Sequence, residues 1–109
     1  MDFIRVGTLA EIPDGEVRGF DLPKGRVAVA HVDHRLHAVS DMCTADGGSL
    51  SEGVLRFEGE PAVECACGER FDVETGEPVE GGSGDPVPTF AVHEVDGWVE
   101  VGTQPGVHS

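Results

Sequence analysis

Apolar and polar residues alternate in several short runs of this chain, with the two-residue period of a half-buried β-strand. Glu16–Leu22 shows the pattern, because charged residues there alternate with apolar ones. Pro, Gly and Asp residues separate the runs and predict turns. The pattern predicts strands over residues 3–6, 16–22, 26–32, 36–40, 54–57, 62–64, 90–95 and 98–101. Only Thr8–Ile12 predicts helix, a single capped turn that Pro13–Gly15 ends.

Two of these strand pairs are joined by two-residue turns, Asp33–His34 and Asp96–Gly97. The first hairpin holds three of the five histidines. With His34 at the tip, strand geometry puts His31 and His37 on opposite faces, so the three imidazoles do not chelate one ion together. In the second hairpin, Trp98 alternates with two valines and is expected in the core.

All three cysteines lie in the stretch Cys43–Gly76. Two short loops begin with cysteine, one at Cys43 and one at Cys65, and the second loop also holds Cys67. The two strand-like runs between the loops bring the loop tips side by side. A pair of thiolates at adjacent tips is the usual basis of a metal or iron–sulfur site.

This stretch resembles the cluster-binding segment of Rieske-type ferredoxins, which read C-T-H-x-G-x-x-L-x-x-G and then, after a hairpin, C-P-x-H-G-x-x-F-D-x-x-T-G. The matching residues are Cys43–Thr44, Gly47, Leu50, Gly53, Cys65, Phe71–Asp72 and Thr75–Gly76. The resemblance implies an all-β fold, a Rieske-like antiparallel β-sandwich or barrel. It implies one domain over residues 1–109, a small cluster-binding-type subdomain at about residues 43–82, and a tail at residues 103–109.

The ligand positions depart from the family pattern. The family binds a [2Fe–2S] cluster with two Cys and two His, and Cys43 and Cys65 match the cysteines. Ala45 occupies the first histidine position, and Cys67 or Gly68 occupies the second, depending on the alignment anchor. No histidine of this chain falls on a family ligand position.

The chemistry that remains is a set of three thiolates from Cys43, Cys65 and Cys67. Either a [2Fe–2S] cluster or a mononuclear iron or zinc ion suits such a set. The fourth ligand is Asp46, Asp41, water, or a histidine, of which His37 is the nearest upstream of Cys43. In an extended strand, Cys65 and Cys67 would lie roughly 6.6 Å apart on one face, a spacing that favours two irons over one ion.

The net charge of the chain limits the kinds of partner that we expect it to bind. The 109 residues carry a formal net charge of −14, which opposes binding to nucleic acid and to anionic membranes and suits docking to a basic protein. A merely solvated acidic surface explains the charge equally well. Three cysteines do not form a disulfide framework. The N-terminal residues lack a signal-peptide pattern and no apolar run spans a bilayer, so we expect a cytoplasmic protein.

The resemblance implies an electron-transfer ferredoxin that serves an oxygenase or related oxidoreductase, with a flavin-dependent ferredoxin reductase as donor and a terminal oxygenase as acceptor. It implies an electron-transfer component more than a stand-alone enzyme. The alternative is a cluster-free binding, regulatory or scaffold subunit, as in the Rieske-fold small subunits of assimilatory nitrite reductases. A third outcome is thiol chemistry, including a Cys43–Cys65 disulfide, which a reducing cytosol disfavours.

Overall fold

The computed structural model describes residues 2–23, 25–44, 47–57, 61–79 and 85–105. The strands are β1 (Phe3–Thr8), β2 (Val17–Leu22), β3 (Gly25–Val32), β4 (Arg35–Ser40), β5 (Val54–Arg56), β6 (Ala62–Glu64), β7 (Arg70–Asp72), β8 (Thr89–Val95) and β9 (Trp98–Pro105). Two 3-10 turns complete the elements, η1 (Leu9–Glu11) and η2 (Leu50–Glu52). Every predicted strand is confirmed, while β7 and η2 were not predicted. β9 extends four residues past its predicted end, so residues 103–105, which were predicted to belong to the tail, are part of the strand.

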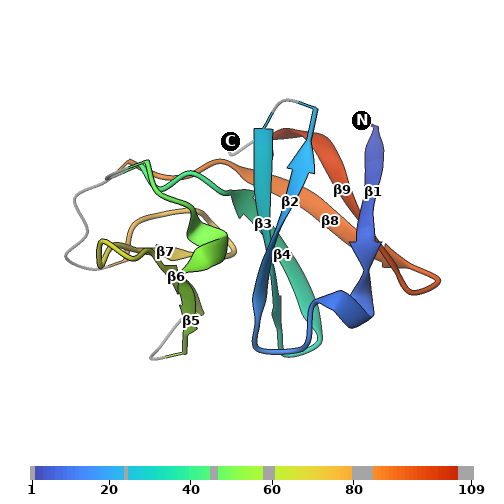
Figure 1. The fold of residues 1–109 in the computed structure, drawn as a ribbon, viewed down its shortest axis with the longest axis horizontal. Coiled ribbons are helices and arrows are strands. Elements are labelled where there is room, and N and C mark those ends of the chain that lie inside the picture. Colours follow the sequence, from blue (N-terminus) through green and yellow to red (C-terminus); the bar gives the residue numbers. More distant parts are fainter. Residues whose placement is uncertain (1, 24, 45–46, 58–60, 80–84, 106–109) are drawn as a thin grey trace.

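Six strands form one antiparallel sheet in the order β1-β9-β8-β4-β3-β2. The two end strands, β1 and β2, also contact each other. The sheet therefore curls toward a closed barrel, which confirms the predicted all-β class. A smaller three-stranded sheet, in the order β5-β6-β7, lies at one end of the molecule (Figure 1).

β3 is the central strand of the packing, because both of its faces are buried. Val27 and Val29 face the inside of the curled sheet, in a cluster with Ile12, Ala38, Val99 and Val101. Ala28 and Ala30 face the other way, toward the smaller sheet. The four residues form a continuous buried apolar run, which is the expected pattern for a strand covered on both faces.

The second cluster joins the two sheets. It contains Val17, Ala28, Ala30, Val32, Val39, Cys43, Leu50, Val63, Cys65, Phe71, Val73 and Val87. Alanine is small, so Ala28 and Ala30 let the smaller sheet approach β3 closely. The two cysteines at the starts of the loops are therefore part of the core, and the packing between the sheets holds them in place.

Trp98 is not the core residue that its alternation predicted. Its side chain is 39% exposed, and the Arg5 guanidinium lies over the indole ring at 4.8 Å from the ring centroid. The alternation is real, but the buried face of β9 is the one that carries Val99 and Val101. Trp98 lies on the other face, where it stacks with a cation.

Candidate metal centre

The first loop begins at Cys43, three residues after the end of β4, and backbone hydrogen bonds within the loop close it. The Cys43 amide donates to the Gly48 carbonyl at 2.8 Å, and the Gly47 amide donates to the Cys43 carbonyl at 2.8 Å. Gly47 has a φ of 78°, a conformation that glycine adopts without steric cost. The Thr44 hydroxyl donates to the Asp85 carbonyl at 2.5 Å, which fixes this loop to the segment before β8.

The second loop, between β6 and β7, is built in the same way. The Cys65 amide donates to the Glu69 carbonyl at 2.8 Å, and the Gly68 amide donates to the Cys65 carbonyl at 2.8 Å. Gly68 has a φ of 99°. The Cys67 amide also points at the Cys65 sulfur, with N···S at 3.4 Å. Cys65–Gly68 is thus a tight turn, as expected of a loop, and the spacing of roughly 6.6 Å that an extended strand would give does not apply here.

The two turns bring the three thiols together. The sulfur atoms of Cys43, Cys65 and Cys67 all lie within 4.8 Å of one another, and the Cys43 and Cys67 sulfurs are 3.7 Å apart. Thiolates bound to one tetrahedral ion at about 2.3 Å have sulfurs about 3.8 Å apart. The geometry therefore favours one ion over two irons held at a wider spacing. No disulfide joins any two of these three cysteines.

The thiols differ in access to solvent. Cys43 is 1% exposed and Cys65 is 3% exposed, whereas Cys67 is exposed. An ion in this group would have protein on one side and an open coordination position on the side of Cys67, where a fourth ligand or water can bind. Water would not reach the bonds from the ion to Cys43 and Cys65, whereas the bond to Cys67 would lie at the surface.

The histidines do not join the thiols. Within the described residues, the only other group of three or more His, Cys, Asp or Glu ligand atoms this close is formed by Asp14, His31 and His34. His37 belongs to neither group, so the structure does not support its predicted role as a replacement ligand. His31 and His37 lie in register positions on opposite faces of the β3–β4 pair, as predicted. Asp46, a predicted candidate for the fourth ligand, lies outside the described residues, as does Ala45 at the first histidine position.

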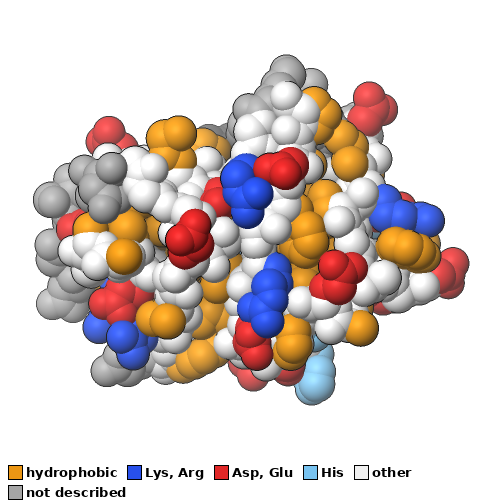
Figure 2. Space-filling view, viewed as in Figure 1, with side chains coloured by type: hydrophobic (Ala, Val, Ile, Leu, Met, Phe, Trp, Pro, Cys, Tyr) orange, Lys and Arg blue, Asp and Glu red, His pale blue; other side chains and the backbone are white. Residues whose placement is uncertain are grey.

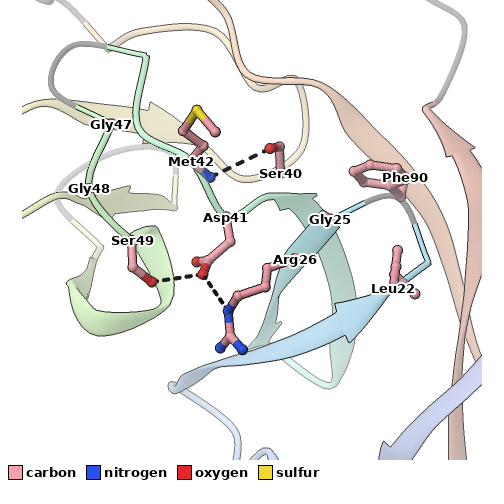
Figure 3. A pocket seen from close by; sticks show the side chains of 10 residues that line it. All are labelled: Leu22, Gly25, Arg26, Ser40, Asp41, Met42, Gly47, Gly48, Ser49 and Phe90. Carbon is pink, nitrogen blue, oxygen red and sulfur yellow. Dashed lines mark hydrogen bonds and ion pairs between the residues drawn. The ribbon is translucent and has the colours of Figure 1, made fainter.

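Asp41, another predicted fourth ligand, has a different role. Its buried carboxylate accepts a hydrogen bond from the Ser49 hydroxyl at 2.7 Å and pairs with the Arg26 guanidinium at 3.2 Å (Figure 3). It also accepts a hydrogen bond from the Ser51 amide at 2.5 Å. These bonds tie the first cysteine loop to the start of β3. Asp41 therefore supports the loop. Its carboxylate is engaged in these hydrogen bonds and this ion pair, so it does not serve as the fourth ligand.

A pocket of about 500 Å³ opens beside this carboxylate. Figure 3 shows Leu22 and Phe90 on one side of it and Met42 with Gly47 and Gly48 on the other. Met42, the neighbour of Cys43, is 63% exposed. The pocket is thus an apolar hollow at the base of the first cysteine loop, and sequence patterning gave no sign of it.

His37 supplies a prediction about pH. Burial lowers its pKa from the ordinary value of 6.5, Glu74 and Asp72 oppose this shift, and Arg35 adds to it. Because the folded pKa is the lower one, the unfolded chain binds more protons, and the free energy of unfolding falls as pH drops through about 6.5. We expect a smaller loss of stability between pH 7.5 and 5.5 in His37→Gln than in wild type, measured by urea unfolding. Equal pH slopes would contradict it.

Comparison with known proteins identifies the family. The family model for the Rieske [2Fe-2S] domain matches residues 2–91. The chain belongs to the Rieske [2Fe–2S] domain family. It is 34% identical, over 89% of its length and 90% of the relative's, to the 3-phenylpropionate/cinnamic acid dioxygenase ferredoxin subunit of Photorhabdus laumondii.

Solved structures agree with this membership. The ferredoxin of carbazole 1,9a-dioxygenase from Nocardioides aromaticivorans IC177 matches with a TM-score of 0.86 and 28% identity, over 95% of this chain and all of that one. A chain in the complex of reduced oxygenase and oxidized ferredoxin in carbazole 1,9a-dioxygenase matches with a TM-score of 0.85 and 28% identity, over 97% of each chain. The Rieske-like fold expected from the cysteine loops is confirmed.

The residues at this Rieske site do not fit the histidine-ligated cluster. That cluster needs two cysteines on one iron and two histidines on the other. Three thiols lie together here, and among the described residues no histidine lies with them. Ala45 has no ligating atom at the first histidine position. The donor set instead fits a thiolate centre made by Cys43, Cys65 and Cys67.

Proposed function

We propose that the chain is a ferredoxin component that carries electrons to an oxygenase or related oxidoreductase through iron bound by Cys43, Cys65 and Cys67. The observation that carries the proposal is the convergence of three thiol sulfurs within 4.8 Å on two tightly closed loops. The relatives named as dioxygenase ferredoxin subunits support the electron-transfer role. Thiolate-bound iron, once in place, supplies a one-electron couple.

The chain's own residues have separate roles in this proposal. Cys43 and Cys65 hold their sulfurs inside the core, where water does not reach them. Cys67 places its sulfur at the surface, at the edge that a redox partner can approach. The amide of Cys67 directed at the Cys65 sulfur stabilises negative charge on that thiolate.

The partners in this proposal are a flavin-dependent ferredoxin reductase as donor and a terminal oxygenase as acceptor, in the cytoplasm. One structural neighbour is itself part of an oxygenase–ferredoxin complex. Nucleic acid and membranes are not among the proposed partners. Within the described residues, no helix has the length and apolar character needed to cross a bilayer.

Anaerobic reconstitution tests the proposal. The purified chain is incubated with ferrous iron and sulfide, desalted, and assayed for iron, acid-labile sulfide, visible absorption and EPR. We expect about one iron per chain and no labile sulfide, because the sulfurs are spaced for one tetrahedral ion. Two irons with two sulfides would overturn the single-ion arrangement and leave the electron carrier standing. Tight zinc binding without iron binding would reject the electron carrier.

The missing histidine ligands favour a second candidate, a cluster-free binding, regulatory or scaffold subunit. This candidate predicts a colourless chain that retains no metal after reconstitution and melts at the same temperature with and without metal. The same assay therefore separates the two candidates, because a thiolate centre that binds only the folded chain raises the melting temperature.

The acidic surface leads to a prediction about docking. Asp and Glu side chains are spread over the whole face drawn in Figure 2, in keeping with the net charge of −14. Attraction to a basic partner is screened over about 10 Å at 0.1 M salt. We expect stopped-flow reduction by a dioxygenase-type ferredoxin reductase to slow by about tenfold between 0.05 and 0.5 M salt. A rate that stays flat over this range would mean that the charge only solvates the surface.

A further inference from the structure

A second group of metal-binding side chains lies away from the cysteine loops. Asp14 comes from the turn before β2, His31 from the end of β3, and His34 from the β3–β4 turn, and their ligand atoms lie within 4.8 Å of one another. These segments meet at the lower edge of the larger sheet in Figure 1, whereas the cysteine loops belong to the left-hand part of the molecule. Histidine is exposed at the same lower edge in Figure 2. We propose that Asp14, His31 and His34 form a binding site for a divalent transition-metal ion.

His31 is already oriented as a metal ligand. Its ring Nδ1 lies 2.7 Å from the Ile12 carbonyl oxygen. A carbonyl only accepts, so Nδ1 carries the hydrogen and Nε2 holds the lone pair that binds a metal. Metal-bound histidines commonly donate their second ring nitrogen in this manner, which fixes the tautomer and the ring orientation. The His31 side chain is 9% exposed, so this ligand is held rigidly.

The backbone keeps Asp14 opposite this ring. The Gly15 amide donates to the His31 carbonyl at 2.6 Å, and the His31 amide donates to the Glu16 carbonyl at 3.0 Å. The two residues directly after Asp14 are thereby bonded to the backbone of His31. Asp14 and His31 are 17 positions apart in sequence, and these bonds explain why they meet.

His34 is the adjustable member of the site. Asp33 and His34 have φ values of 50° and 65°, the left-handed pair of a two-residue hairpin turn. The turn aims the imidazole at Asp14, with Nδ1 3.6 Å from the carboxylate Oδ2. Ligand atoms on one ion with bonds of about 2.0–2.1 Å lie roughly 3.3 Å apart. The side chains of His34 and Asp14 are exposed, so they can approach each other by the small difference between these two distances.

The donor chemistry determines the class of ion. Two imidazoles and one carboxylate suit Zn²⁺, Ni²⁺ and Cu²⁺, with water in the remaining positions, whereas thiolates prefer softer ions. The net charge of −14 raises the local concentration of any cation. The chain would then hold two chemically distinct metal sites, and this one does not depend on the proposed electron-transfer role.

Binding of Ni²⁺ tests the site in the intact chain. Isothermal titration is done with the cysteine site first filled with zinc, on wild type and on His34→Asn and Asp14→Asn. Asparagine tolerates the left-handed turn, so His34→Asn removes the imidazole without straining the backbone. We expect one Ni²⁺ per chain in wild type and an affinity lowered by about tenfold or more in each variant.

His93→Gln is the matched control. His93 lies 2.8 Å from the Glu100 carboxylate, so it is also a histidine–carboxylate pair, but it belongs to no described three-ligand group. We expect its affinity for Ni²⁺ to stay within about twofold of wild type. NMR should show the His31 ring signals shifting or broadening on Ni²⁺ addition. Equal losses in His34→Asn and His93→Gln, or unmoved His31 signals, would mean an adventitious surface ion only and would overturn the proposal.

Discussion

Replacing Cys67 by serine is expected to remove most of the bound iron and leave the fold intact. An exposed thiol contributes little to stability, and substitutions at such positions usually stay within about 0.5 kcal/mol. The same thiol is one of three converging sulfurs, and a neutral hydroxyl is a much poorer ligand than a thiolate for a soft site. The readouts are iron per chain after reconstitution, the visible spectrum, and thermal unfolding of the metal-free chain.

Ala66→Ser is the control for this substitution. Ala66 occupies the same turn and is exposed as Cys67 is, so the variant adds a hydroxyl beside the site and keeps every thiol. We expect its iron content and spectrum to match wild type. Cys43→Ser should differ from both, because it puts a hydroxyl at a core position that is 1% exposed and should lower stability as well as iron content. If Cys67→Ser keeps wild-type iron and spectrum, Cys67 is a bystander.

Sequence patterning located all the strands except β7, because one face of each is at least partly buried. The Ala–Val alternation of β3 is visible in the sequence, and it divides between the two core clusters. β7 was missed because it has three residues with one buried side chain, Phe71, between two partly exposed ones. Its strand character comes from pairing with β6, and a pattern within one segment carries no information about its partner.

The residues of the candidate site could be predicted from the sequence, but the distances between their sulfur atoms could not. The resemblance picked out the three thiols, but the spacing of Cys65 and Cys67 depends on backbone direction. Gly68, with a φ of 99°, closes a turn over Cys65–Gly68, whereas a spacing of roughly 6.6 Å holds only for extended backbone. The Asp14–His31–His34 group could not be predicted from the sequence, for a similar reason. Long-range backbone bonds from Gly15 and Glu16 bring it together, and local periodicity does not reveal such bonds.

The largest effect on folding is expected at Gly76, in the Thr75–Gly76 pair that matches the family motif. Gly76 has a φ of 77°, and a Cβ built there would lie 2.0 Å from the Val87 carbonyl oxygen. That oxygen belongs to the backbone, which is held in place because the Val87 amide donates to the Gly76 carbonyl at 2.8 Å. Val87 is buried in the same cluster as Cys43 and Cys65. An alanine therefore forces apart the packing that supports the metal centre.

Gly97→Ala separates this clash from the cost of the backbone conformation. Gly97 has a φ of 85°, close to that of Gly76, but a Cβ there meets no atom within 4 Å. We expect Gly97→Ala to cost about 1–2 kcal/mol from left-handed strain alone, and Gly76→Ala to cost at least about 3 kcal/mol once overpacking is added. Urea unfolding of the metal-free chains measures both. Because Val87 packs in the cluster that contains Cys43 and Cys65, Gly76→Ala should also weaken metal retention, while Gly97→Ala, at the β8–β9 turn, should not. Equal destabilisation by the two variants would mean that the approach of Gly76 to Val87 does not hold this end of the molecule together.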